Sequence, residues 1–404
     1  MKKKVLAIMC DAGPGNNMVG PIKLLKQNPD LDVIVLSEGP SQRAFQRESV
    51  EYKTLDHYNI KDLICFSDGS REVNPNYVLE ILEKESPDLV FTGISAVPLL
   101  ERYFLYFANE KGIPTVSIID GFDFSSVKQT DTNIDENYRF RPNLVLVADK
   151  NMQNVMIKEG FNPESVVITG LPYYDNLAVL KGEFSEDDKS KVKVWNDLGI
   201  TDRDYVITFI SQALYNAISK GAVKDHGYNE LTVLSALENS LVNLTGFIKN
   251  LCLLVKLHPS EDPNMTRTVI EGKYIKVILD KDYNTRKAIL ASNLVGGMFS
   301  TAMMEAAYLD LDLFSAKPGF IINEETEFLM SPLGYAIPSN DRQITNKIGL
   351  SIPIYRRENL ESHLYTAISN TLIHNQLRKR RLQLSLDGKA TERVVNIIYD
   401  ALNK

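Results

Sequence analysis

The feature that most constrains the fold is an alternation of short apolar runs with helix-like segments, which occurs twice along the 404-residue chain. Such runs are expected to be buried strands, and repeated strand–helix units form parallel sheets covered by helices on both faces. In the first half the expected strands cover residues 5–10, 32–37, 89–92, 115–119, 143–148 and 166–169. In the second half they cover 205–211, 252–257, 275–279 and 293–298. The sequence therefore predicts an α/β protein.

A charged segment separates the two alternating halves. Residues 182–198 carry acidic and lysine side chains around Trp195, the one tryptophan, and are expected to form an exposed linker helix. Because a chain of this length usually divides into domains of about 150–200 residues, we predict Rossmann-like domains at 1–180 and 181–385. Residues 386–404 contain an amphipathic stretch and are predicted to form a terminal helix that packs back on the first domain.

Composition limits the classes of function. The net charge of −7 argues against nucleic acid as the main partner, because binding a polyanion requires a basic surface. No stretch approaches the ~20 apolar residues of a membrane span, and the apolar run near the N-terminus is too short for a signal peptide. Cys10, Cys65 and Cys252 are unevenly placed, so they predict neither a disulfide framework nor a zinc site. We therefore expect a cytoplasmic protein.

The segment from Asp11 to Asn17 is rich in glycine and joins the first expected strand to its helix. Glycines there allow close approach of a ligand, and a following helix favours an anion. The third glycine of the dinucleotide motif is missing and no Gly-Lys-Ser/Thr follows, so NAD and ATP are disfavoured and no cofactor is predicted. Gly13 and Asn16 either form a generic turn or line the acceptor side of an active site.

Three further segments end expected strands, where open α/β sheets place their ligand-binding loops. The first is Ile119-Asp120-Gly121. Asp120 could remove a proton from an incoming hydroxyl, and Gly121 would leave space for that acceptor to approach. Asp120 could instead cap the next turn. The residues alone leave both roles open.

The other two segments lie in the second half. His258 stands at the end of a strand, where its imidazole could hydrogen-bond the phosphate of a leaving nucleotide, and Pro259 stiffens the turn. Ser300 and Thr301 begin a helix and could donate to the same phosphate. A structural hydrogen bond for the histidine and a simple N-cap for the hydroxyls are the alternatives. Glu305 follows one turn later and could reach a ribose.

A polar segment offers candidate ligands for a donor sugar. Ser211 and Gln212 end the first strand of the second half, and Asp225 and His226 precede a long helix. Their side chains could bind a sugar carboxylate or hydroxyls, and Asp225 competes with Asp120 for the role of base. A polar loop ahead of a helix is the commoner explanation.

Two other patterns have structural explanations. Residues 310–312 match the metal-binding Asp-X-Asp of GT-A glycosyltransferases, but they join a helix to a strand, and no His/Asp/Glu cluster has metal spacing. No metal is therefore predicted. The basic run 377–381 is expected to be a solvated helix face, with peripheral contact to anionic lipid at the inner face of the membrane as the alternative.

Together the segments resemble motifs of the bacterial sialyltransferases, polysialyltransferases and capsule Kdo transferases. Those enzymes carry an acidic Asp/Glu-Asp/Glu-Gly motif, a His-Pro motif and a Ser-Ser or Ser-Thr motif in this order, although here Ile119 replaces the leading acid. The resemblance implies a GT-B fold with an acceptor-binding first domain and a nucleotide-sugar-binding second domain. It implies that Asp120 is the general base, that His258 assists the departing CMP, and that Ser300 and Thr301 hold its phosphate.

The resemblance predicts a metal-independent glycosyltransferase that moves an acidic sugar from a CMP-sugar donor to a glycan or glycolipid acceptor. The sugar would be a sialic-acid-like nonulosonic acid or Kdo, and the acceptor a hydroxyl of a capsule or lipopolysaccharide glycan. The alternatives are a UDP-sugar 2-epimerase, a CDP-glycerol or CDP-ribitol phosphotransferase, and a non-catalytic sugar-nucleotide-binding protein of a polysaccharide assembly complex. The epimerase is disfavoured because its expected set of acids and histidines is not apparent.

Overall fold

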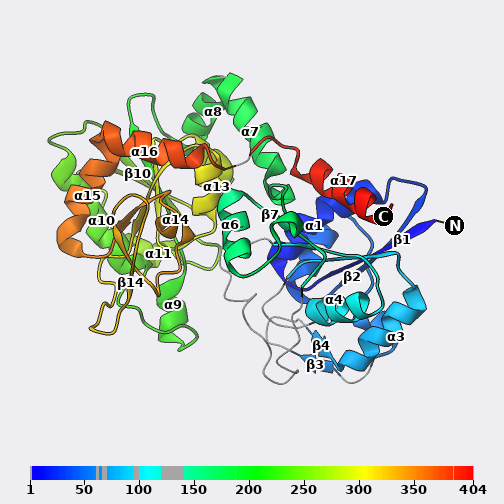
Figure 1. Ribbon diagram of the computed structural model, residues 1–404. Coiled ribbons are helices and arrows are strands. Elements are labelled where there is room, and N and C mark those ends of the chain that lie inside the picture. The colour runs from blue at the N-terminus through cyan, green and yellow to red at the C-terminus, as the bar shows by residue number, and fades with distance from the viewer. Residues whose placement is uncertain are drawn as a thin grey trace. The chain divides into compact units, whose positions relative to one another are not determined.

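The chain divides into two compact units. Unit 1 comprises Met1–Asn176 and Ser385–Lys404, and unit 2 comprises Leu177–Leu384 (Figure 1). The computed structural model describes residues 2–60, 63–65, 71–94, 100–119, 141–186, 188–384 and 386–403. The boundary between the units falls within helix α7 (Asp175–Glu186), which α8 (Asp188–Leu198) follows.

Unit 1 is built on a six-stranded parallel sheet in the order β2-β1-β5-β6-β7-β8. Its strands are β1 (Lys3–Met9), β2 (Leu31–Ser37), β5 (Leu89–Thr92), β6 (Thr115–Ile118), β7 (Leu144–Val147) and β8 (Val166–Ile168). Its helices are α1 (Ala12–Leu25), α2 (Gln42–Arg47), α3 (Pro75–Glu85), α4 (Leu100–Glu110), α6 (Lys150–Lys158) and α17 (Ala390–Leu402). Strands β3 (Leu63–Cys65) and β4 (Arg71–Val73) form a separate antiparallel pair.

Strand β1 is buried on both faces of this sheet. Successive side chains of a strand point to opposite faces. Val5 and Met9 belong to the apolar cluster that also contains residues of α1 and α17, whereas Leu6 and Ile8 belong to the cluster that contains residues of α3 and α4. A strand covered on both faces needs a continuous apolar run, which explains why this segment was predictable from the sequence.

Helix α17, at the C-terminus, packs beside α1 (Figure 1). Val394 of α17 lies in the same buried cluster as Ile22 of α1. The carboxylate of Asp175 accepts hydrogen bonds from the backbone N–H groups of Ala390 (2.9 Å) and Thr391 (2.8 Å). These bonds satisfy N–H groups that the start of a helix leaves without partners. The end of the chain is therefore an integral part of unit 1.

Unit 2 repeats the architecture with a six-stranded parallel sheet in the order β11-β10-β9-β12-β13-β16. Its strands are β9 (Tyr205–Ile210), β10 (Leu251–Lys256), β11 (Lys276–Asp280), β12 (Leu294–Gly297), β13 (Asp312–Ala316) and β16 (Ile352–Ile354), with a separate antiparallel pair β14 (Phe328–Met330) and β15 (Ala336–Pro338). Its helices are α9 (Leu214–Ser219), α10 (Glu230–Leu244), α11 (Pro263–Arg267), α12 (Thr285–Leu290), α13 (Ala302–Tyr308), α14 (Ile344–Lys347), α15 (Arg357–Ser369) and α16 (Thr371–Arg381).

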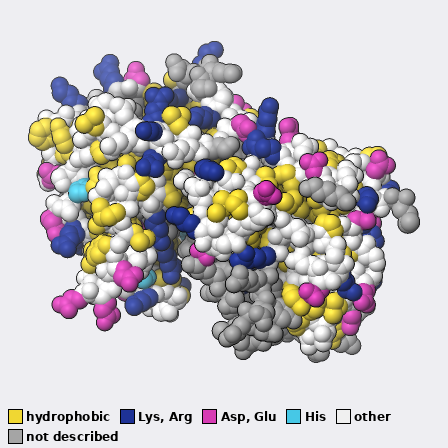
Figure 2. Space-filling view, in the orientation of Figure 1, with side chains coloured by type: hydrophobic (Ala, Val, Ile, Leu, Met, Phe, Trp, Pro, Cys, Tyr) yellow, Lys and Arg dark blue, Asp and Glu magenta, His cyan; other side chains and the backbone are white. Residues whose placement is uncertain are grey.

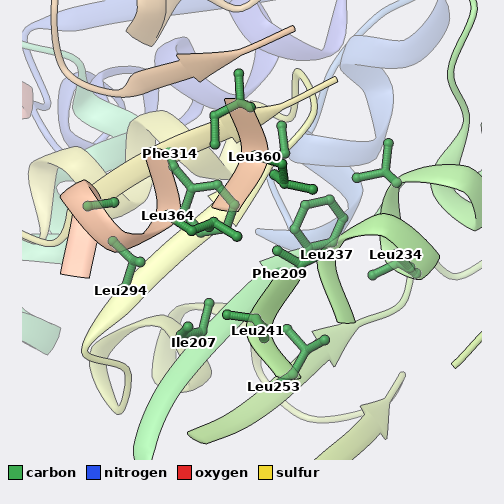
Figure 3. Packing of buried hydrophobic residues seen from close by; sticks show 14 of the residues in the cluster. Ile207, Phe209, Leu234, Leu237, Leu241, Leu253, Leu294, Phe314, Leu360 and Leu364 are labelled. Atoms are coloured by element: carbon green, nitrogen blue, oxygen red, sulfur yellow. The ribbon is translucent and has the colours of Figure 1, made fainter. Parts of the chain in front are cut away.

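The core of unit 2 lies between one face of its sheet and helices α10 and α15. Leu237 of α10 and Leu364 of α15 pack with Phe209 of β9 and Phe314 of β13 (Figure 3). A Cβ atom on Gly296 of β12 would collide with the Phe314 ring. Glycine is therefore required at that position, because the ring occupies the space that a larger residue would need.

The two parallel sheets confirm the predicted α/β class with two Rossmann-like halves. The prediction of a loop at residues 11–17 is wrong, because α1 begins at Ala12 and includes all of this segment except Asp11. The glycines serve packing: a Cβ on Gly15 would lie 2.8 Å from the Cα of Ser41, and a Cβ on Gly93 would collide with Pro14. The glycine-rich sequence thus lets the first turns of α1 lie close to neighbouring backbone.

The charged segment 182–198, near the start of unit 2, is less exposed than predicted. In α8, Val194 is buried, and the indole N–H of Trp195 donates to the carbonyl of Ala291 (2.9 Å). On the basic run of α16, Arg381 is buried and pairs with Asp310 and Asp312, while Arg378 and Lys379 are exposed.

The surface mixes charges of both signs. On the face shown in Figure 2, acidic and basic side chains are interspersed. None of the helices in the described part of the chain has the length and apolar character needed to cross a bilayer.

Candidate functional site

One pocket in unit 2, of about 510 Å³, gathers polar side chains from three strand ends. We refer to it as the sheet-end pocket. Its lining includes six of the predicted site residues, Ser211, Gln212, His258, Pro259, Ser300 and Thr301. They follow β9, β10 and β12, which are neighbours in the order β10-β9-β12. Because parallel strands present their carboxyl ends at one edge of a sheet, segments far apart in the sequence meet in this pocket.

The end of β9 is connected to both neighbouring strand ends. The backbone N–H of Ser211 donates to the carbonyl of Lys256 (2.9 Å), and its hydroxyl donates to Glu261 (2.7 Å). The side-chain carbonyl of Gln212 accepts from the backbone N–H of Phe299 (3.0 Å). The amide oxygen of Gln212 thus points to Phe299, which leaves its NH₂ group as a donor for a ligand. Ser211 has its hydroxyl proton committed to Glu261.

His258 is exposed at the end of β10, and Ser260 orients its ring. The backbone N–H of Ser260 donates to Nδ1 (3.2 Å), and the Ser260 hydroxyl lies 2.7 Å from the same nitrogen. A backbone N–H can only donate, so Nδ1 is the acceptor and the neutral ring carries its proton on Nε2. His258 therefore has an N–H donor that its own turn does not use.

Glu261 is a residue of this region that the sequence prediction missed. Its side chain is buried and accepts from the backbone N–H of His258 as well as from the Ser211 hydroxyl. Its own backbone N–H donates to the carbonyl of His258 (2.9 Å). Burial raises the pKa of Glu261. A sequence signal for Glu261 does exist, because it lies three residues after His258. In a capping box an acid at this spacing bonds back to the backbone N–H of the earlier residue.

Glu230, at the first position of α10, is a second buried carboxylate that the prediction missed. It accepts hydrogen bonds from the backbone N–H groups of Leu214 (2.9 Å) and Tyr215 (2.8 Å) at the start of α9. Burial raises the pKa of Glu230 as well. Glu230 therefore holds in place the start of α9, which directly follows Gln212 of the sheet-end pocket.

Ser300 and Thr301 lie between β12 and α13. Ser300 Oγ accepts from the backbone N–H of Ala302 (3.3 Å), so its own proton remains available to a ligand. Thr301 is exposed, and its side chain makes no capping bond to α13. The hydroxyls of Ser300 and Thr301 are therefore available to a ligand of the sheet-end pocket.

Two charged residues near the pocket are already paired. Lys256 lines the pocket, but its ammonium bonds to the carboxylate of Asp280 at 2.6 Å. Glu305, predicted to reach a ribose, does not line the pocket. Its carboxylate accepts two bonds from the guanidinium of Arg286, at 3.0 and 2.9 Å. The ribose role of Glu305 stays a prediction.

The predicted sugar ligands Asp225 and His226 lie elsewhere in unit 2. Asp225 is exposed, and its carboxylate turns back to accept from the backbone N–H of Gly227 (2.7 Å). His226 lines a second, smaller pocket of about 20 Å³ that shares Phe299 with the sheet-end pocket. The structure thus places His226 in a pocket that adjoins the one lined by Ser211 and Gln212.

The predicted acceptor side belongs to unit 1. The carbonyl of Gly13 accepts from the Asn17 side chain (3.1 Å), and the side-chain carbonyl of Asn16 accepts from Arg47 (3.1 Å). Both residues are thus engaged in local hydrogen bonds. Asp120 and Gly121 lie outside the described residues, so their roles stay predictions.

Metal ligands are not clustered in the part of the chain that the structure describes. No group of three or more His, Cys, Asp and Glu side chains there could hold a metal ion. Asp310 and Asp312, which match the Asp-X-Asp pattern, accept bonds from the buried guanidinium of Arg381 at 2.8 and 2.7 Å. This pairing accounts for the two acids as structural residues.

No protein-family model and no curated protein matches the sequence. Solved structures do match. UDP-GlcNAc 2-epimerase from Neisseria meningitidis bound to UDP-GlcNAc has a TM-score of 0.58 at 13% identity, over 98% of this chain and 100% of that chain. MurG from Acinetobacter baumannii has a TM-score of 0.60 at 13% identity, over 98% and 99%. MnaA from S. aureus with UDP has a TM-score of 0.59 at 15% identity, over 99% and 97%.

At these identities the likeness shows the fold. The matches span nearly the whole of each chain, so the similarity includes both six-stranded parallel sheets. The protein therefore has the GT-B fold, as the motif resemblance implied. None of the three structures is named as a sialyltransferase or a Kdo transferase.

Proposed function

We propose that this protein is a nucleotide-sugar enzyme in which unit 2 holds the nucleotide and helps it leave the anomeric carbon of the sugar. The observation that carries the proposal is the sheet-end pocket, where the His-Pro and Ser-Thr segments meet the end of β9. Its position at the carboxyl ends of three parallel strands is the usual place for a ligand in such a sheet. Similarity to structures solved with UDP-GlcNAc or UDP supports the same class of ligand.

The chemistry follows from the donors in the pocket. When the bond between the anomeric carbon and the phosphate breaks, negative charge develops on the phosphate oxygen. The Nε2–H of His258 and the hydroxyls of Ser300 and Thr301 can donate to that oxygen or to its neighbours. Donors positioned in advance stabilise the developing charge, and loss of one typically costs about 10²–10³-fold in rate. Glu261 contributes by holding the His258 turn.

The first candidate reaction is 2-epimerisation of a UDP-sugar. If UDP leaves while a proton is removed from C2, the resulting C1–C2 double bond can take up a proton from the opposite face. Return of UDP to C1 then gives the epimer. Support for this outcome comes from the similarity to UDP-GlcNAc 2-epimerases, one of them bound to UDP-GlcNAc.

The second candidate is transfer of an acidic sugar from a CMP-sugar to a glycan hydroxyl. It is favoured by one observation, the meeting of the His-Pro and Ser-Thr segments in a single pocket. In this reaction Asp120 would take the proton of the acceptor hydroxyl. Asp120→Ala should then lower turnover by about 10²-fold or more and leave CMP affinity nearly unchanged.

Proton NMR of the reaction mixture distinguishes the candidates. The protein is incubated with UDP-GlcNAc, and separately with CMP-N-acetylneuraminic acid or CMP-Kdo plus a glycan acceptor. Epimerisation gives a second anomeric signal without net release of UDP, whereas transfer releases CMP. His258→Ala should slow the observed reaction by about 10²-fold. His363→Ala, which removes a partly exposed histidine of α15, serves as the matched control. Turnover unaffected by His258→Ala would contradict the proposed role of the pocket.

A further inference from the structure

The smaller pocket of unit 2 differs in character from the sheet-end pocket. It is lined by aromatic and cationic side chains that include Lys224, His226, Tyr228, Phe320, Asn340 and Arg342. We refer to it as the cationic pocket. Phe299 lines both pockets, so the two lie next to each other.

The backbone around the cationic pocket is held by a close contact between two loops. The N–H of Ile321 donates to the carbonyl of His226 (2.9 Å). Gly227 has φ +87°, and a Cβ there would collide with the carbonyl oxygen of Gly319. Only glycine adopts this conformation readily and permits the contact. The loop that carries His226 is therefore fixed against the loop that follows β13.

Aromatic stacking orients the side chains. The His226 ring stacks on Phe320 with centroids 6.4 Å apart and planes 10° apart. Tyr228 stacks on the same ring at 5.8 Å and 23°. The polar edges of His226 and Tyr228 are thus presented from a rigid aromatic base.

The charge of the cationic pocket is unbalanced. Within the described residues, Lys224 and Arg342 make no ion pair with a carboxylate. Of the two acids adjacent in sequence, Asp341 forms a fully buried ion pair with Lys317. Asp225 bonds to the backbone of Gly227 and lies close enough to His226 to offset part of the positive charge. Burial, and then the charges of Arg342 and Lys224, lower the pKa of His226. The surroundings of His226 are therefore electropositive.

We propose that the cationic pocket binds a second oxyanion of the nucleotide sugar, next to the phosphate held in the sheet-end pocket. This inference rests on the proposed function. In the sheet-end pocket the ammonium of Lys256 is already paired with Asp280. The cations that can bind a second anionic group of the ligand are therefore Lys224 and Arg342 of the cationic pocket. The guanidinium of Arg342 can bind the two oxygens of a carboxylate or a phosphate with parallel hydrogen bonds. The oxyanion is either the carboxylate of an acidic sugar or the second phosphate of a nucleoside diphosphate.

Isothermal titration calorimetry with matched ligand pairs tests this proposal. CMP is compared with CMP-N-acetylneuraminic acid, and UMP with UDP. The second member of the first pair adds a sugar that carries a carboxylate, and that of the second pair adds a phosphate. The variants are Arg342→Met and Lys224→Met, with Lys379→Met, an exposed charge on α16, as the control. Because hydrogen bonds to charged groups are worth roughly tenfold or more in affinity, Arg342→Met should weaken the second member of one pair by about that factor. The first member should bind as before, and Lys379→Met should bind every ligand as the unmodified protein does.

The two sources of the oxyanion give different results. A loss confined to the CMP-sugar identifies a carboxylate, and a loss confined to UDP identifies a second phosphate. If Arg342→Met and Lys224→Met bind all four ligands like the unmodified protein, the inference is overturned while the proposed function stands. An equal loss for both members of each pair also overturns it, because the cation would then serve the first phosphate. If the unmodified protein binds none of the four, both proposals fail.

Discussion

Replacement of Glu261 by alanine should destabilise unit 2 and loosen the His258 turn. The side chain accepts two hydrogen bonds, one from the Ser211 hydroxyl at 2.7 Å and one from the backbone N–H of His258. A lost bond to a carboxylate costs about 1.5–3 kcal/mol, and a donor left without a partner adds to this, so Glu261→Ala should lower the free energy of unfolding by about 2–4 kcal/mol. Glu261→Gln keeps an acceptor for the backbone N–H of His258 and can donate to Ser211 Oγ, so it should recover most of the loss.

Urea denaturation followed by tryptophan fluorescence measures this effect. Trp195 is the one tryptophan, and its indole donates to the carbonyl of Ala291, so its signal reports on unit 2. Glu325→Ala, which removes an exposed carboxylate from the same unit, is the control and should unfold like the unmodified protein. The reasoning fails if Glu261→Ala unfolds at the same urea concentration as the unmodified protein, or if Glu261→Gln is no more stable than Glu261→Ala.

Three further outcomes are expected. Lys317→Met removes one partner of a fully buried ion pair and should cost about 3–5 kcal/mol of stability in urea. Adding Asp341→Asn to Lys317→Met should restore much of the lost stability. Lys317→Met alone being as stable as the unmodified protein would refute the pairing. Burial raises the pKa of Glu261 above its ordinary value of 4.5, so its contribution to stability is full below that pH and is lost as pH rises through the raised pKa. Glu261→Gln should flatten this decline in urea titrations carried out at increasing pH above 4.5, and an unchanged slope would contradict the shift. Gly296→Ala should destabilise unit 2 by about 1–3 kcal/mol because its Cβ meets the Phe314 ring. Phe314→Leu should relieve the clash, which comparison of the urea midpoints of the single and double variants can show.

The long buried strands could be predicted because burial on both faces leaves a continuous apolar run in the sequence. The expected strand 252–257 corresponds to β10 (Leu251–Lys256), and 205–211 to β9 (Tyr205–Ile210). The strand β16 (Ile352–Ile354) and the β14–β15 pair were missed. Each of these strands has three residues, so its pairing depends on tertiary contacts that no local pattern records.

The candidate site was predictable only in part. His258, Ser300 and Thr301 could be singled out because polar residues directly after apolar strands mark the binding edge of a parallel sheet. Their meeting required the strand order β10-β9-β12, which the sequence does not specify.

Side-chain partners across loops could not be predicted. Glu305 pairs with Arg286, and Glu261 is buried beneath the His258 turn. Asp225 and His226 are adjacent in sequence, yet the carboxylate of Asp225 folds back on Gly227 while the His226 ring lines the cationic pocket. These differences depend on contacts between segments, which a single sequence does not encode in any short motif.

The most direct test of the central claim is the affinity of the Ser300→Ala/Thr301→Ala double variant for nucleotides, measured by titration calorimetry with UDP and with CMP. Thr245→Ala, which removes an exposed hydroxyl elsewhere in unit 2, is the matched control. If the sheet-end pocket holds the nucleotide phosphate, the double variant should bind the preferred nucleotide at least about tenfold more weakly, since two hydrogen bonds to a charged group are lost. The control should bind it as the unmodified protein does. Equal affinity in the double variant and the unmodified protein would contradict the account.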